Sequence, residues 1–190
     1  MTANASNILP LKGVKESLFP LEYYAKVQGS LESILESANT FYDVDTIEKI
    51  FAILQHFINL NYGRLYVCNA ENTQLAAKYG RTLALAALKR GNYSLGEGVT
   101  GQAFLERQAL YVTDLAHQPM YKGRSLRAMD LPYKNPAYMA VPFYGEHWAG
   151  VVGFHLSARS RFDVIATIAI VSLIAEWLAN KHFEFELRAA

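Results

Sequence analysis

The residues best suited to bind a ligand lie in a segment with neither a helical nor a strand period, residues 114–136 (DLAHQPMYKGRSLRAMDLPYKNP). It carries four basic residues against two acidic ones, with tyrosines interleaved. Basic side chains form charge-assisted hydrogen bonds with anions, and structureless loops of this length are uncommon unless they are functional. The segment therefore predicts a loop that covers a small anionic ligand. An ordinary solvated loop is the alternative.

Catalytic and metal-binding patterns are weak in this sequence. The five histidines show no His-x-x-x-His or His-Glu-x-x-His spacing, and Cys68, the single cysteine, has no neighbouring base to activate it. The glycine-rich segment 96–101 (GEGVTG) lacks the Lys-Ser/Thr of a phosphate-binding loop. We interpret it as a tight turn that leads into a helix lying close to another backbone. Direct anion contact by that helix N-terminus is the alternative. We expect no enzyme, no cofactor and no metal.

Length and composition limit the class of protein. A chain of 190 residues with 52% hydrophobic residues can bury the core of one domain, which excludes a disordered chain. Because 18 Lys and Arg stand against 17 Asp and Glu, the basic excess of a general nucleic-acid binder is missing. Residues 1–7 show no targeting pattern, and the most apolar stretch, 162–179, contains two acidic residues. We expect a cytoplasmic protein without a membrane or nucleic-acid partner.

Hydrophobic periodicity predicts the elements that position the loop. Helices are predicted at residues 21–38, 45–58, 82–89, 99–106 and 161–187. Strands are predicted at residues 64–68, 74–79, 109–113, 137–143 and 147–156, with an edge position or a bulge at Pro142. Short connections between neighbouring strands favour an antiparallel sheet with helices on one face, an α+β fold.

Three segments carry a resemblance to a known family. Residues 93–113 (YSLGEGVTGQAFLERQALYVT) resemble the GAF-domain segment in which a glycine-rich turn leads into a helix and a strand. Residues 138–156 (YMAVPFYGEHWAGVVGFHL) resemble the GAF hairpin, and Phe162-Asp163 before an apolar helix is similar to the usual C-terminal helix. The resemblance covers residues 21–187, between a lead-in at 1–20 and a tail at 188–190. GEGVTGQ followed by YVTDLAHQPMY is most similar to the N-terminal sensory GAF domain of nitrogen-fixation-type, sigma-54-dependent transcription activators.

This resemblance implies a GAF/PAS-like, six-stranded antiparallel sheet. The N- and C-terminal helices pack on one face, and a loop-covered pocket lies on the other. Such domains bind small effectors or partner proteins and relay the signal to an output domain, which in the activator subgroup is an ATPase followed by a DNA-binding domain. Three subgroups fit poorly. The cyclic-nucleotide signature is missing because Asn180-Lys181 comes too late, the bilin-attachment cysteine is missing from the loop region, and the methionine-sulfoxide-reducing members need more cysteines than Cys68.

We therefore expect a non-catalytic GAF sensory domain whose pocket lies between the sheet and loop 114–136. A ligand that prefers one loop arrangement shifts the equilibrium, and the terminal helices relay the shift. The candidate pocket walls are Tyr111, Tyr138 and Phe154. The candidate polar contacts are Arg124, Arg127 and Tyr133. His155 stays open between a hydrogen-bonded core histidine and a pocket contact.

The terminal helices also suggest a homodimer. The apolar seam at 21–38 and the stripe at 165–179 can pair across a two-fold axis, or each can pack within its own chain. Two other functions stay open. A ligand-free module for protein interaction or dimerisation would show a filled interior and an exposed apolar patch. A small enzyme on the same fold would need a perturbed titratable group beside a nucleophile.

Overall fold

The computed structural model describes residues 8–10, 25–26, 29–30, 33, 44–58, 62–81, 85–157 and 161–180. The five described residues between 25 and 33, part of the predicted helix 21–38, are helical. The rest of that helix lies outside the described residues, as do most of the predicted lead-in 1–20, the tail 188–190 and the end of the predicted helix 161–187.

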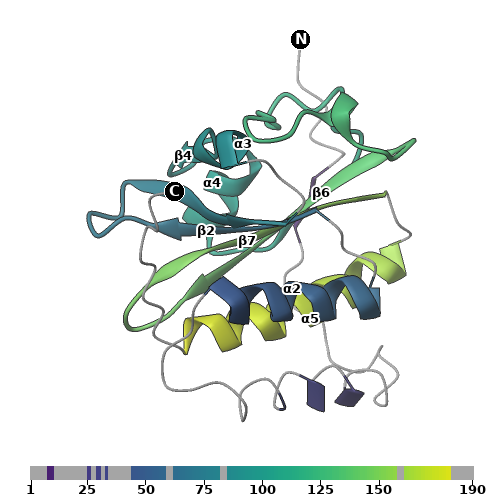
Figure 1. Ribbon diagram of the computed structural model, residues 1–190. Coiled ribbons are helices and arrows are strands. Elements are labelled where there is room, and N and C mark those ends of the chain that lie inside the picture. The colour runs from purple at the N-terminus through teal and green to yellow at the C-terminus, as the bar shows by residue number, and fades with distance from the viewer. Residues whose placement is uncertain are drawn as a thin grey trace.

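One antiparallel sheet forms the centre of the fold (Figure 1). It has seven strands in the order β1-β5-β6-β7-β2-β3-β4. The strands are β1 (Ile8–Pro10), β2 (Tyr62–Cys68), β3 (Gln74–Gly80), β4 (Asn92–Ser94), β5 (Leu110–Val112), β6 (Pro136–Tyr144) and β7 (Ala149–Ser157). The six strands from β5 to β4 form the predicted sheet, so the predicted α+β fold is confirmed. β1, from the predicted lead-in, adds a seventh strand by pairing with β5. The sequence patterns predict neither β1 nor β4.

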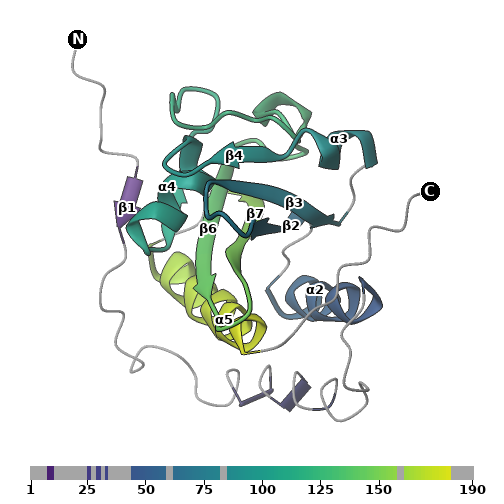
Figure 2. The same ribbon diagram turned by 90° about the vertical axis from the view of Figure 1, so that its left-hand side faces the viewer.

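Two long helices cover one face of this sheet. Helix α2 (Val44–Ile58) and helix α5 (Arg161–Ala179) lie beneath it in both views (Figures 1 and 2). Ile47, Ile50 and Leu54 recur three and four residues apart along α2 and are fully buried, which places them on one apolar stripe facing the sheet. The predicted packing of helices on one face is therefore confirmed. None of the described helices is long and apolar enough to cross a membrane.

Part of the apolar stripe at 165–179 belongs to this core. The sequence predicts that this stripe can pair in a dimer. Ile168 and Ala175 are 5% and 2% exposed and pack in the same cluster as α2 and the sheet. These two side chains therefore stabilise the single chain and have no surface to offer a second copy. The other half of the expected pairing, the seam at 21–38, lies mostly outside the described residues.

The opposite face of the sheet carries the elements that enclose the site. Helix α3 (Leu85–Lys89), helix α4 (Gly98–Glu106) and residues 114–135, with the short 3-10 helix η3 (Ala128–Asp130), lie above it (Figures 1 and 2). Gly101 lets α4 approach β4, because a Cβ there would lie 2.3 Å from the carbonyl oxygen of Ser94. This close approach agrees with the tight-turn interpretation of residues 96–101.

Pro142 occupies a position in β6 that tolerates a missing N–H donor. β5 pairs with β6 only as far as Leu110 opposite Ala140. Beyond that point β7 is the one described strand beside β6, with Val151 opposite Pro142. Of the two predictions for this proline, an edge position or a bulge, the structure shows the edge position.

Candidate functional site

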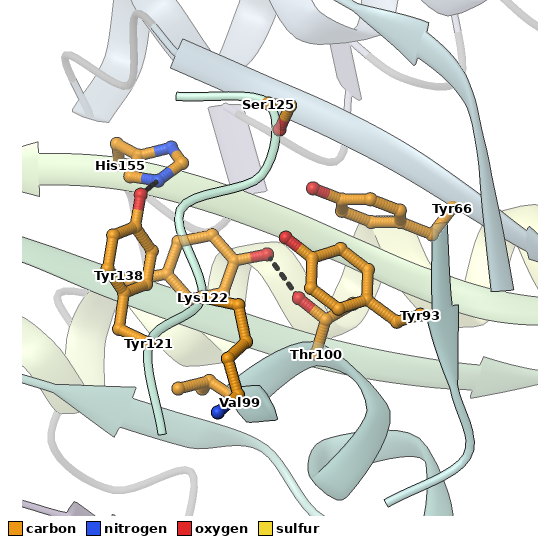
Figure 3. A pocket seen from close by; sticks show the side chains of 9 residues that line it. All are labelled: Tyr66, Tyr93, Val99, Thr100, Tyr121, Lys122, Ser125, Tyr138 and His155. Carbon is orange, nitrogen blue, oxygen red and sulfur yellow. Dashed lines mark hydrogen bonds between the residues drawn. The ribbon is translucent and has the colours of Figure 1, made fainter. Parts of the chain in front are cut away.

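A small hollow lies between the sheet, α4 and the segment 118–126. Its cavity volume is about 10 Å³, room for roughly one water-sized group. Figure 3 shows the side chains around it. It is lined by Tyr66, Tyr93, Val99, Thr100, Tyr121, Lys122, Ser125, Tyr138 and His155.

The sheet forms the floor of the hollow. Tyr138 of β6 lies opposite His155 of β7, and residues opposite each other in neighbouring strands share one face of a sheet. Gly153, two residues before His155, points to the same face. A Cβ there would lie 2.2 Å from the Tyr138 hydroxyl oxygen, so only glycine leaves room for this phenol to lie across β7.

Helix α4 forms one wall and is tied to the floor. Gly98, at its first position, has a φ of 65°, a left-handed conformation that favours glycine. Thr100 follows two residues later, and its Oγ1 lies 2.9 Å from the Tyr138 hydroxyl, in a buried hydrogen bond (Figure 3). The helix start, the sheet and the hollow are thereby held together.

A buried arginine lies beside the hollow. Arg64 of β2 is 0% exposed. Its Nε donates to Ser125 Oγ at 3.1 Å, and its Nη1 lies 3.0 Å from His155 Nδ1 and 3.2 Å from the carbonyl oxygen of Tyr62. Its Nη2 is buried without a hydrogen-bond partner. No acidic side chain of the described residues forms an ion pair with Arg64.

The arginine fixes the protonation of His155. Arginine has only donors, so Nδ1 of His155 accepts the bond from Arg64. Burial, and secondarily the charge of Arg64, lower the pKa of His155 well below its usual value, against a smaller opposing effect of a backbone hydrogen bond to Tyr62. The neutral ring therefore carries its proton on Nε2. His155 is both a hydrogen-bonded core histidine and a lining residue, which covers both interpretations of the sequence.

The second nitrogen of this ring ties the covering segment to the sheet. His155 Nε2 lies 2.6 Å from the Tyr121 hydroxyl, which in turn donates to the carbonyl oxygen of Leu126. These bonds form a directed chain from Arg64 through His155 to Tyr121. The phenol of Tyr121 thus joins residues 118–126 to the floor of the hollow, and the bond from Arg64 to Ser125 joins them to β2.

The groups that line the hollow do not neutralise the positive charge of Arg64 beside it. Burial raises the pKa values of Tyr93, Tyr121 and Tyr138, so these phenols are neutral, as His155 is. Lys122 adds a second cation at the exposed side. No acidic residue lines the hollow, and no described group of three or more His, Cys, Asp or Glu is arranged to hold a metal ion.

The structure brings one predicted wall, Tyr138, to this hollow together with His155, and it separates the other two predicted walls from it. Tyr138 and His155 line it, whereas Tyr111 and Phe154 lie on the opposite face, in the core with α2 and α5. Both pair with Met139, the neighbour of Tyr138. Because neighbouring residues of a strand point to opposite faces, the prediction that Tyr111 and Phe154 share a wall with Tyr138 is wrong.

The predicted polar contacts do not line the hollow. Arg124 pairs with Glu97, donates to the carbonyl oxygen of Asn92 and lies 5.3 Å from the ring centre of Tyr93. Arg127 forms an exposed ion pair with Asp130 at 2.8 Å. The ring of Tyr133 lies edge-on to Tyr62, with centroids 5.9 Å apart.

Sequence reasoning missed most of the lining residues and the buried arginine. Arg64 looks like an ordinary basic residue at the start of a strand. One signal was available, because alternation from Tyr66 places Arg64 on the same face as that tyrosine. Tyr121 and Ser125 lie in a segment without a period, which gives no indication of where their side chains point.

The comparisons with known proteins identify the fold. No family model and no curated protein sequence matches the chain. Among solved structures, the GAF domain of A. aeolicus nlh2 in an inactive state is similar, with a TM-score of 0.65, 15% identity and coverage of 83% of this chain and 95% of that one. The GAF domain of a phosphoenolpyruvate-protein phosphotransferase from Coxiella burnetii gives a TM-score of 0.61, 14% identity and coverage of 82% and 91%. The chain therefore has the fold of GAF domains.

Enzymes share this fold, which corrects one expectation. Free methionine-R-sulfoxide reductase from Neisseria meningitidis, in complex with its substrate, is similar with a TM-score of 0.57, 14% identity and coverage of 86% of this chain and 90% of that one. The reduced form of fRMsr of Staphylococcus aureus is also similar, with a TM-score of 0.55 and 20% identity. The expectation that the chain is not an enzyme is therefore contradicted, because the fold serves catalysis as well as regulation.

Proposed function

We propose that this chain is a regulatory domain that binds a small molecule in the hollow and reports its occupancy through the segment 114–135. The observation that carries the proposal is the lining. Hydroxyl groups of Tyr66, Tyr93, Thr100, Ser125 and Tyr138 converge on one buried space. A few polar groups among aromatic walls, enclosed by a loop, are typical of small-molecule sites.

Binding in this site requires movement of the covering segment. The hollow holds roughly one water-sized group, so a larger molecule displaces Tyr121 or Lys122. The hydroxyl of Tyr121 ties the segment to the sheet through His155. A ligand that occupies this space therefore competes with the hydrogen bond between Tyr121 and His155. Its affinity for the open arrangement of the segment shifts the equilibrium between the open and the closed arrangement.

The route from the hollow to the rest of the molecule runs through β6. Tyr138 faces the hollow, and the next residue, Met139, faces the cluster that contains α2 and α5. A displacement of this strand therefore reaches both helices. The proposal also includes a homodimer, in which the terminal helices transmit the signal to an output domain. It further includes a cytoplasmic location. The proposed setting of this domain in a sigma-54-dependent transcription activator depends on the resemblance of residues 96–102 and 111–121.

The small volume of the hollow also favours a second candidate. A domain whose interior is filled by its own side chains can act as a ligand-free module for protein interaction. Leu105 and Met129, at 57% and 79% exposure, offer apolar contacts on the face that carries the hollow. The experiment below separates the two candidates.

Native mass spectrometry of freshly purified protein, followed by a thermal-shift screen of small metabolites, tests ligand binding. We expect a retained or added molecule to stabilise the protein, and we expect Tyr66→Phe and Tyr138→Phe to reduce that stabilisation. Tyr62→Phe is the matched control, because Tyr62 lies on the same face outside the lining. The proposal fails, and the interaction module is favoured, when no molecule stabilises the protein or when all three variants respond alike.

A further inference from the structure

We propose that the ligand of this hollow carries a single carboxylate and that Arg64 is the residue that anchors it. This inference rests on the proposed function and names its ligand class. It depends on a buried charge that the protein itself leaves unbalanced.

The imbalance follows from the partners of Arg64. A guanidinium group is charged at any physiological pH, and this one is fully buried. Its neighbours are neutral: a serine hydroxyl, a backbone carbonyl and a histidine ring that accepts through Nδ1. A buried charge is costly unless it is paired. An anion in the hollow supplies the missing partner.

The geometry provides two adjacent donors for that anion. Nη2 of Arg64 has no acceptor among the described residues. Ser125 Oγ accepts from Nε on the same guanidinium, which leaves its own hydroxyl proton available. Ser125 and His155 both line the hollow, and both bond to this guanidinium, so Arg64 lies directly behind the lining. The proposal places its Nη2 within reach of a ligand that enters there. One carboxylate oxygen can accept from Nη2 and the other from Ser125.

The charge and the walls favour a carboxylate over a phosphate. One buried cation neutralises one negative charge, whereas a phosphate dianion would leave an unpaired charge beside neutral phenols. Lys122 is exposed, so solvent screens it as a second partner. The rings of Tyr66, Tyr93 and Tyr138 offer flat apolar surfaces to an organic group attached to the carboxylate.

The test compares matched probes on the full chain by thermal shift and calorimetry. Acetate and benzoate are the carboxylates, acetamide and benzamide are their neutral counterparts, and inorganic phosphate is the dianion. We expect the carboxylates to bind, the amides not to bind, and Arg64→Met to weaken carboxylate binding on the order of 100-fold, as loss of a buried charged partner does. Arg127→Met, which removes an exposed arginine of the covering segment, is the control and should bind as wild type does.

A second pair of variants keeps the inference testable when Arg64→Met does not fold. Arg64→Lys retains the charge but loses Nη2, and Ser125→Ala removes the second donor together with the acceptor of Arg64 Nε. Both variants should weaken benzoate binding. Without ligand, their unfolding midpoints should lie closer to that of the wild type than the midpoint of Arg64→Met does. Equal binding of amides, stronger binding of phosphate, or carboxylate binding that Arg64 variants do not change would overturn the inference. A neutral molecule that binds in a Tyr66-dependent manner would overturn it while leaving the proposed function intact.

Discussion

Replacement of Tyr121 by phenylalanine removes a hydroxyl that joins the covering segment to the sheet, and it leaves the bond from Arg64 Nε to Ser125 Oγ in place. The variant keeps the ring, which lies 5.6 Å from the ring centre of His155 and 5.9 Å from that of Tyr138. It loses the bonds to His155 Nε2 and to the carbonyl oxygen of Leu126. At about 0.5–1.5 kcal/mol for each bond, the expected loss of stability is about 1–3 kcal/mol.

Hydrogen exchange locates this loss. When the free energy of a local opening falls by about 1–3 kcal/mol, the amides that it exposes exchange roughly 5- to 150-fold faster. We expect this acceleration in amides of residues 118–126 and little change in α2, which packs on the other face of the sheet. In a chain of this size, the unfolding midpoint should fall by roughly 2–12 °C.

The control for this experiment is Tyr62→Phe, a phenol on the same face of the sheet that does not line the hollow. Unchanged exchange of residues 118–126 in Tyr121→Phe, or an equal acceleration over the whole chain, would refute the view that this hydroxyl ties the segment to the sheet.

Three further predictions concern the same site. The pKa of His155 is lowered in the folded chain, so near the ordinary histidine pKa of about 6.5 the unfolded chain binds more protons than the folded chain. The contribution of His155 to stability should therefore be fully present above that pH. It should be lost as the pH falls toward the pKa of His155 in the folded chain. Urea unfolding between pH 8 and pH 5 measures this slope, and His155→Gln should flatten it while His117→Gln, at an exposed position, should not; equal slopes in all three proteins would contradict the assignment. Gly153→Ala places a methyl group 2.2 Å from the Tyr138 hydroxyl and should lower the free energy of unfolding by about 1–3 kcal/mol, as measured by urea denaturation; a variant as stable as wild type would show that this phenol does not need the space. Arg127→Ala should leave ligand-induced stabilisation unchanged in a thermal-shift assay, because its guanidinium pairs with Asp130 at the surface, and a loss of stabilisation would restore Arg127 as a ligand contact.

The long, periodic segments of the chain were predictable from the sequence. Helix α2 has a clear apolar stripe, and the β6–β7 hairpin combines a short turn with two apolar runs, so both follow from local pattern. The three-residue strands β1 and β4 do not, because such short pairings depend on the neighbouring strand rather than on their own residues. In β4 only Tyr93 is buried, and two exposed residues flank it.

The faces of the central strands were harder to predict. Both faces of β6 and β7 are covered, so their residues are almost uniformly apolar and alternation is hidden. For this reason alternation does not separate Phe154 from its neighbour His155, and only the register shows that their side chains point to opposite faces. Arg64 was missed because its importance comes from complete burial and from partners that are 61 and 91 residues away in the sequence.

The most direct measurement is a crystal structure of the protein with benzoate bound. The account predicts density for a carboxylate beside Nη2 of Arg64, within hydrogen-bond distance of Ser125 Oγ, and a displaced Tyr121 side chain. Benzoate found only at the surface, with Tyr121 still bonded to His155 and the hollow unchanged, would contradict it.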